Sequence, residues 1–180
     1  MSSLFVYPVS SPDLPNKVLT HVDDMASTLT ELGVRFERFC VATAVRPGTA
    51  EEDVLDAARA QLDQLMTQHG CVAVEVISLD NNHPQKAERC AALLREQRQD
   101  AGQVWCFLGG RGQLSLHLGD YVYAVQCERN DLVVVPAGTA HWFDLGEEPR
   151  CVVLRLFDKT ERALSLVEDD LAGRFPGLDD

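Results

Sequence analysis

The sequence predicts an α+β protein in which helices gather in the N-terminal half and the C-terminal half forms an antiparallel barrel or double-sheet roll. Before residue 95, apolar residues recur at helical spacing in several segments. From Gln103 onwards the chain consists of short alternating segments separated by glycine or charged turns. A length of 180 residues with 46% hydrophobic side chains suffices for one core but not for two, so we expect a single domain over residues 1–180.

The N-terminal part, residues 1–95, contains the expected helices. Asp23 can cap a helix that stops at Gly33. A longer helix begins near Thr49, where three acidic side chains lie at the positive end of the helix dipole, and it closes at Gly70. The expected strands here are residues 4–7, 34–39 and 72–79, and the expected helices are residues 24–32, 49–69 and 86–95.

The central part, residues 96–160, is the expected barrel core. Its alternating runs predict strands at residues 104–108, 113–118, 121–127, 131–135, 140–145 and 151–157. The tail, residues 161–180, is weakly helical in pattern and ends in turn residues. No internal repeat or low-complexity segment is visible.

Charge and composition limit the partners and the compartment. The 28 acidic and 16 basic side chains give a net charge of −12, which argues against binding nucleic acid or an anionic membrane. No apolar run approaches the roughly 18 residues of a membrane helix, and the N-terminus lacks the pattern of a secretory signal. The six widely spaced cysteines form no Cys-x-x-Cys pair, so we expect buried, reduced thiols in a cytoplasmic protein.

One motif connects the C-terminal half to a known family. Pro136-Ala137-Gly138-Thr139-Ala140-His141 has the Pro-x-Gly-x-x-His pattern of the second cupin motif. Further stretches agree in order and spacing, and they are residues 35–38, 76–79, 83–88, 127–132, 141–144 and 154–157. Across nearly its whole length the chain resembles the cupins, and more narrowly the acireductone dioxygenases of methionine salvage. The resemblance implies a cupin double-stranded β-helix.

The resemblance also implies a metal site, and here the sequence departs from the family. The family's first motif is His-x-His followed by a Glu, and a later His completes the site for Fe or Ni. The matching positions in this chain are Gln97, Gln99, Gln103 and His141. Gly110, at its expected place in the motif, supports this register. Neutral amides are weak donors for such metals, so we expect no cofactor, and Fe or Ni only if the family activity is retained.

The remaining pocket residues predict a neutral to mildly cationic site. His141 is the candidate acid or base, and Arg155 matches a family arginine that lies near the substrate. The expected substrate-binding side chains are Gln97, Gln99, Gln103, Trp105 and Phe143. Trp105 stands where the family usually has an arginine. Cys106 alternates with Trp105 and should point away from the pocket.

Each site residue also has a structural reading. His141 can be a hydrogen-bonded structural residue, and Arg155 can pair with a barrel carboxylate such as Glu128 or Asp144. The three glutamines can bond one another in a pocket that has no activity. Glu96 and Asp100 are expected to face solvent or to cap the turn.

These residues support three functional hypotheses. The first is a divergent family member that has lost the metal site and performs metal-independent acid/base or cofactor-free chemistry on a small enolisable oxo or enol substrate, including anionic ones. The second is a working acireductone dioxygenase with unusual ligands. The third is a non-catalytic ligand-binding cupin. A monomer or homodimer is expected in each case.

Overall fold

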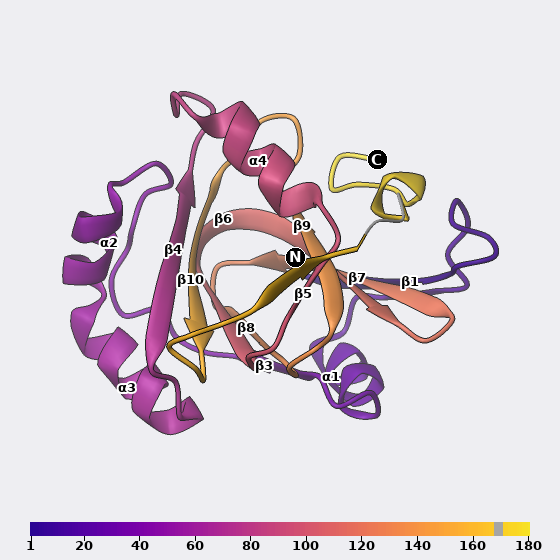
Figure 1. The fold of residues 1–180 in the computed structure, drawn as a ribbon, viewed down its shortest axis with the longest axis horizontal. Coiled ribbons are helices and arrows are strands. Elements are labelled where there is room, and N and C mark those ends of the chain that lie inside the picture. The colour runs from indigo at the N-terminus through magenta and orange to yellow at the C-terminus, as the bar shows by residue number, and fades with distance from the viewer. Residues whose placement is uncertain (168–170) are drawn as a thin grey trace.

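The computed structural model describes residues 1–167 and 171–180, which form a curved antiparallel sheet with helices on its outer side (Figure 1). The strands are β1 (Ser3–Pro8), β2 (Lys17–Leu19), β3 (Arg35–Arg38), β4 (Ala73–Leu79), β5 (Gln97–Gln99), β6 (Gln103–Leu118), β7 (Tyr121–Glu128), β8 (Asp131–Val135), β9 (Ala140–Asp144), β10 (Cys151–Phe157) and β11 (Leu164–Leu166). The helices are α1 (Val22–Thr30), α2 (Glu51–Ala57), α3 (Arg59–His69), α4 (Lys86–Leu94) and the 3₁₀ turn η1 (Ala172–Arg174). The predicted α+β class, with an antiparallel sheet in the C-terminal half, is confirmed.

Strand β6 joins the two halves of the barrel. Its first part pairs with β8 and β10, and its second part pairs with β7 and β9. The sequence predicted two strands, at 104–108 and 113–118, but the chain continues as one strand through a bend. Gly110 makes the bend possible because it has a φ of 70°, and a Cβ there would collide with the carbonyl oxygen of Arg150.

Alternation along β6 separates two cores. Trp105 and Phe107 point into the barrel, where they join a large apolar cluster. Cys106 and Leu108 point the other way, against residues of α2 and α3. The predicted orientation of Cys106 away from Trp105 is therefore confirmed.

Helices α2 and α3 lie beside β4 and β10 on one flank of the molecule (Figure 1). The sequence predicted one continuous helix over residues 49–69, but the structure interrupts it at Ala58, which has φ −101° and ψ 9°. Val54 before the break and Leu62 and Leu65 after it are all buried. The interruption lets both segments keep their apolar side on the twisted sheet.

Several N-terminal and C-terminal details differ from the sequence prediction. The N-cap of α1 is His21, two residues before the expected Asp23, which instead lies in the first turn. The short edge strand β2 was not predicted, because the segment before it is rich in turn residues. The tail is not helical at Leu164–Leu166, where it forms β11 and supplies hydrogen-bonding partners for the edge of β5. The part of the tail prediction at residues 168–170 lies outside the described residues.

The part predicted as the barrel core does not close the sheet alone. β1, β3 and β4 come from the first 95 residues and pair with β7, β8 and β10 respectively. Within the described ranges, no helix is long and apolar enough to cross a membrane.

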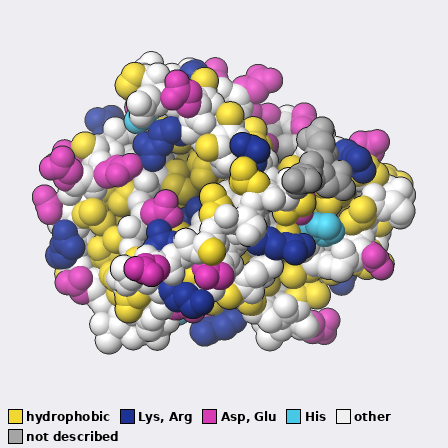
Figure 2. All heavy atoms as spheres, in the orientation of Figure 1, with side chains coloured by type: hydrophobic (Ala, Val, Ile, Leu, Met, Phe, Trp, Pro, Cys, Tyr) yellow, Lys and Arg dark blue, Asp and Glu magenta, His cyan; other side chains and the backbone are white. Residues whose placement is uncertain are grey.

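Most of the negative charge lies at the surface. Among the described acidic side chains, only Glu96 and Asp131 are buried. Figure 2 shows acidic and basic side chains interspersed over one face of the molecule. Four of the six free cysteines are buried as expected, but Cys40 is exposed and Cys90 is half-buried.

Candidate active site

Four strands bring together the polar side chains that the sequence singled out. Gln97 and Gln99 lie on β5, Gln103 begins β6, His141 lies on β9 and Arg155 lies on β10. Gln97 is the direct register partner of His141. All five are buried, with exposed fractions between 1% and 7%. Residues from four separate strands therefore form one enclosed polar cluster.

Arg155 is the centre of this cluster. Its Nε donates a hydrogen bond of 2.8 Å to Gln103 Oε1, and its Nη2 lies 3.0 Å from His141 Nε2. Trp105 Nε1 donates a second hydrogen bond, of 3.1 Å, to the same Gln103 oxygen. Gln103 thus holds the guanidinium and the indole in fixed positions beside the imidazole.

The other two glutamines bond each other. Gln99 Nε2 donates to Gln97 Oε1 at 3.2 Å, while Arg98, between them on β5, is exposed. The predicted inward orientation of Gln97 and Gln99 is therefore observed. Each of these two buried side chains therefore makes one hydrogen bond within the pair.

The contacts of His141 define its protonation. Its Nδ1 lies 2.8 Å from the Thr139 carbonyl oxygen, which can only accept, so Nδ1 carries the proton. Nε2 is then the lone-pair nitrogen that accepts from Arg155. Burial and, next, the charge of Arg155 lower the pKa of His141 to about 4, so the ring is neutral at pH 7. Burial lowers the pKa of Arg155 to about 10, which leaves it cationic at that pH.

Aromatic side chains wall the cluster on one side. The Trp105 ring lies 5.0 Å from Phe143 and 6.2 Å, edge to face, from His141. The Arg155 guanidinium lies 4.6 Å above the Trp105 ring, a cation–π contact in a desolvated place. Phe143 contacts the indole, and it also packs on Phe107 at 5.9 Å. Trp105 and Phe143 therefore form an apolar wall beside the polar cluster, and their role in binding substrate stays a prediction.

The structural reading of Arg155 as a partner of a barrel carboxylate is not what the structure shows. Glu128 pairs with the N-terminal amine and with Arg38 instead. Asp144 accepts hydrogen bonds from backbone N–H groups in the C-terminal loops. Among the described residues, Arg155 instead hydrogen-bonds to the neutral side chains of Gln103 and His141, and the charge of Glu75 on β4 favours its cationic form.

The prediction that Glu96 faces solvent is wrong. Glu96 is 3% exposed, and its Oε1 lies 3.0 Å from His117 Nδ1 on β6. Glu96 alternates with Gln97 and so points away from the glutamines, toward His117 on β6. The tail pairs with its backbone, since Val167 donates its N–H to the Glu96 carbonyl oxygen. No sequence signal predicted the contact with His117. Asp100 is exposed, as expected of a solvent-facing residue, and it accepts a hydrogen bond from the Ala163 N–H in the tail rather than from its own turn.

Comparison with known proteins identifies the class. The solved structure described as acireductone dioxygenase from Bacillus anthracis with cadmium ion in active center matches with a TM-score of 0.76 at 22% sequence identity. The match covers 93% of this chain and 98% of that one. The fold is that of the acireductone dioxygenases, a cupin fold.

Sequence relatives then give the family. The profile of the ARD/ARD′ family matches residues 10–164. A protein of Pseudomonas syringae pv. tomato named acireductone dioxygenase is 56% identical over 181 residues, and one of Pseudomonas aeruginosa with the same name is 48% identical, each over the full length of both chains. The chain belongs to the acireductone dioxygenase family.

The Fe or Ni ion that this family implies does not fit the side chains present here. Three of the four expected ligand positions are neutral amides, which are poor donors for these metals. Gln103 Oε1 already accepts two hydrogen bonds. The nitrogen of His141 that is not engaged by Thr139 faces a guanidinium at 3.0 Å, so a divalent cation there would meet a fixed positive charge.

Proposed function

We propose that this member of the acireductone dioxygenase family no longer uses a metal site and acts on a small enolisable oxo or enol molecule without Fe or Ni. The observation that carries the proposal is the contact of Arg155 with both Gln103 and His141 Nε2. A buried guanidinium there supplies the positive charge that a metal ion supplies in a metal-dependent site. An enediolate or enol carboxylate is the kind of ligand that such a cation binds.

A bound substrate could turn His141 into a base by replacing its nitrogen as the hydrogen-bond acceptor for Arg155. When a substrate oxyanion accepts from Arg155, the guanidinium charge is offset and His141 Nε2 loses its present donor. Since that charge is one cause of the low pKa of His141, the imidazole becomes a better base in the complex. Proton transfer of this kind suits enolisation, isomerisation, dehydration or decarboxylation, which need no electrons from a metal.

A second candidate is the activity named for the relatives. Full-length identity of 56% to a protein called acireductone dioxygenase favours it. It requires that the substituted site still direct oxidative cleavage of the enediol. Anaerobic addition of acireductone followed by O₂ decides the matter, because a rate no faster than the uncatalysed oxidation removes this candidate.

Metal analysis tests the lead proposal directly. Purified protein, expressed in medium supplemented with Fe and Ni, is analysed by mass spectrometry of its elements, with His141→Ala as the matched variant. We expect the same trace metal content in both. One tightly held Fe or Ni per chain that disappears in His141→Ala contradicts the proposal.

Restoration of the family ligands provides the complementary test. The triple variant Gln97→His, Gln99→His, Gln103→Glu replaces the amides with imidazole and carboxylate donors on the same strands. Titration with Ni²⁺ by calorimetry is expected to show saturable binding to the variant and none to the natural chain. Equal binding by both contradicts the loss of the site. Substrate binding without turnover, altered by His141→Ala only in affinity, would favour the non-catalytic cupin instead.

A further inference from the structure

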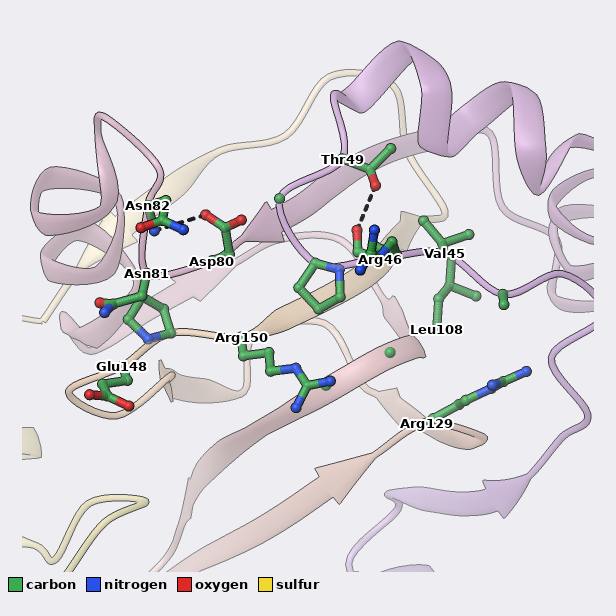
Figure 3. Close-up of a pocket in the computed structure, with 16 residues that line it drawn as sticks. Val45, Arg46, Thr49, Asp80, Asn81, Asn82, Leu108, Arg129, Glu148 and Arg150 are labelled. Carbon is green, nitrogen blue, oxygen red and sulfur yellow. Dashed lines mark hydrogen bonds between the residues drawn. The ribbon is translucent and has the colours of Figure 1, made fainter.

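A cavity lies away from the candidate active site. It has a volume of about 800 Å³ and is lined by residues 44–49, 80–82, 108–110 and 148–150 together with Arg129 (Figure 3). Its floor is the bend of β6, six residues along the strand from Gln103, which corresponds to about 20 Å at strand spacing. None of the candidate site residues lines it. The cavity is therefore separate in position and in composition.

Three arginines from three different segments line this cavity. Arg46 lies in the loop before α2, Arg129 in the turn between β7 and β8, and Arg150 directly before β10. All three are exposed, and within the described residues none of their guanidinium groups has an ion pair or hydrogen bond. In the close-up, Arg150 extends over the β6 segment that forms the floor (Figure 3).

Six of the other arginines have a carboxylate partner, whereas these three have none within the described residues. Ion pairs with carboxylates engage Arg35, Arg38, Arg59, Arg89, Arg111 and Arg162. The chain has 28 acidic residues, so carboxylates are plentiful. Three neighbouring cations that stay unpaired in so acidic a protein leave a local positive charge available to a ligand.

Two carboxylates also line the cavity, but neither pairs with these arginines. Asp80 accepts a hydrogen bond from the N–H of Asn82, and its other oxygen packs against Gly48. Glu148 is turned away from the Arg150 guanidinium in the close-up (Figure 3). The carboxylates thus leave the guanidinium groups free.

The lining also offers bare backbone and neutral polar groups. Gly109 and Gly110 contribute backbone without side chains to the floor. Asn81 and Asn82 add amide groups at the rim. The volume falls in the range of roughly 300–1,000 Å³ that is typical of small-molecule sites.

We propose that this cavity binds a small organic polyanion, a molecule with two or more phosphate or carboxylate groups, through Arg46, Arg129 and Arg150. The planar guanidinium fork matches both anionic groups, and a ligand with several charges offsets the repulsion among the three cations. The inference is independent of the function proposed for the barrel site.

Calorimetric titration with pyrophosphate and with citrate, at constant ionic strength, tests this site and separates phosphate from carboxylate chemistry. We expect saturable one-to-one binding of at least one of them. The double variant Arg129→Gln, Arg150→Gln should weaken that binding by about tenfold or more, because two charge-assisted contacts are lost. The matched control Arg95→Gln, Arg98→Gln removes two exposed arginines that also lack ion pairs and lie outside the cavity. It should change the affinity by less than about twofold.

Two results overturn the proposal. One is no saturable binding of either anion to the natural chain, and the other is equal weakening in the control, which would show a net-charge effect alone. Amide resonances give a readout that does not depend on the variants: those of Gly109 and Gly110 should shift on titration, while that of Thr139 in the barrel site should not. If the amide resonances of Gly109 and Gly110 do not shift on titration, that result also contradicts the proposed site.

Discussion

At the scale of single residues, the site depends on one cation next to one neutral imidazole. Arg155 donates toward His141 Nε2, and Thr139 accepts the proton of Nδ1, so both nitrogens are engaged in defined roles. Trp105 shields the guanidinium from one side and shares the Gln103 oxygen with it. Neutral hydrogen-bond partners thus hold this buried guanidinium. It has no direct ion pair among the described residues, although the charge of Glu75 on the neighbouring strand favours its cationic form.

The effect of Arg155 on His141 can be measured. In the variant Arg155→Gln, the positive charge beside Nε2 is gone, so the pKa of His141 should rise from about 4 toward its ordinary value. It should remain below that value because burial is the larger cause. Titration of the His141 imidazole resonances by NMR, in the natural chain and in the variant, measures both the rise in pKa and the shift that remains. An unchanged pKa in the variant would show that Arg155 does not set the protonation of His141.

The thiols provide a second residue-scale prediction. Burial raises the pKa of Cys106, Cys127 and Cys151, so these thiols are neither ionised nor accessible at pH 8. Cys40 is exposed. A disulfide-exchange reagent should therefore modify Cys40 rapidly in the native protein, and Cys40→Ser should abolish that fast phase. The three buried thiols should react only on unfolding, and fast labelling of any of them would contradict the packing described above.

At the scale of elements, the bend of β6 is the point where one strand serves both halves of the barrel. Gly110→Ala would force a side chain into a left-handed conformation and against the Arg150 carbonyl. Gly119→Ala is the matched control, because Gly119 has a φ of 63° but no atom within 4 Å of an added Cβ. The control should lose about 1–2 kcal/mol of unfolding free energy from backbone strain alone. Gly110→Ala should lose at least about 2 kcal/mol more, as measured by urea unfolding, and equal losses would show that the close contact is unimportant.

The same strands show which features of the structure could be predicted from the local sequence. Period-2 alternation correctly oriented Gln97, Gln99 and Trp105, because in a strand the side-chain direction follows from the backbone itself. It did not predict the burial of Glu96, whose side chain contacts His117, 21 positions further along the chain. Glycines near residue 110 suggested a turn, whereas hydrogen bonds to two different neighbours keep β6 continuous. Contacts made by remote segments were therefore the part that the sequence could not supply.

For the candidate site, the positions were predictable and the partners were not. Motif register placed His141 and Arg155 in one pocket, and the structure brings them together. Two alternatives for Arg155 were compatible with the sequence. It could be a cation that binds the substrate, or it could form an ion pair with Glu128 or Asp144. Only the three-dimensional arrangement shows a guanidinium directed at His141 and Gln103, since these contacts link residues that are 14 and 52 positions apart.

At the scale of the whole molecule, the buried imidazole couples the site to folding. In the folded chain the pKa of His141 is about 4, against 6.5 for a free histidine, so between these values the unfolded chain binds more protons than the folded one. The stability attributable to His141 is fully present above pH 6.5 and is lost as the pH falls toward 4, by about 3 kcal/mol in all. Unfolding free energies of the natural chain and of His141→Gln, measured by urea at several pH values, isolate this contribution because all other groups are shared. We expect the difference between the two proteins to change steadily over this interval and to be constant above it. A difference that does not vary with pH would mean that His141 is not held neutral by the fold.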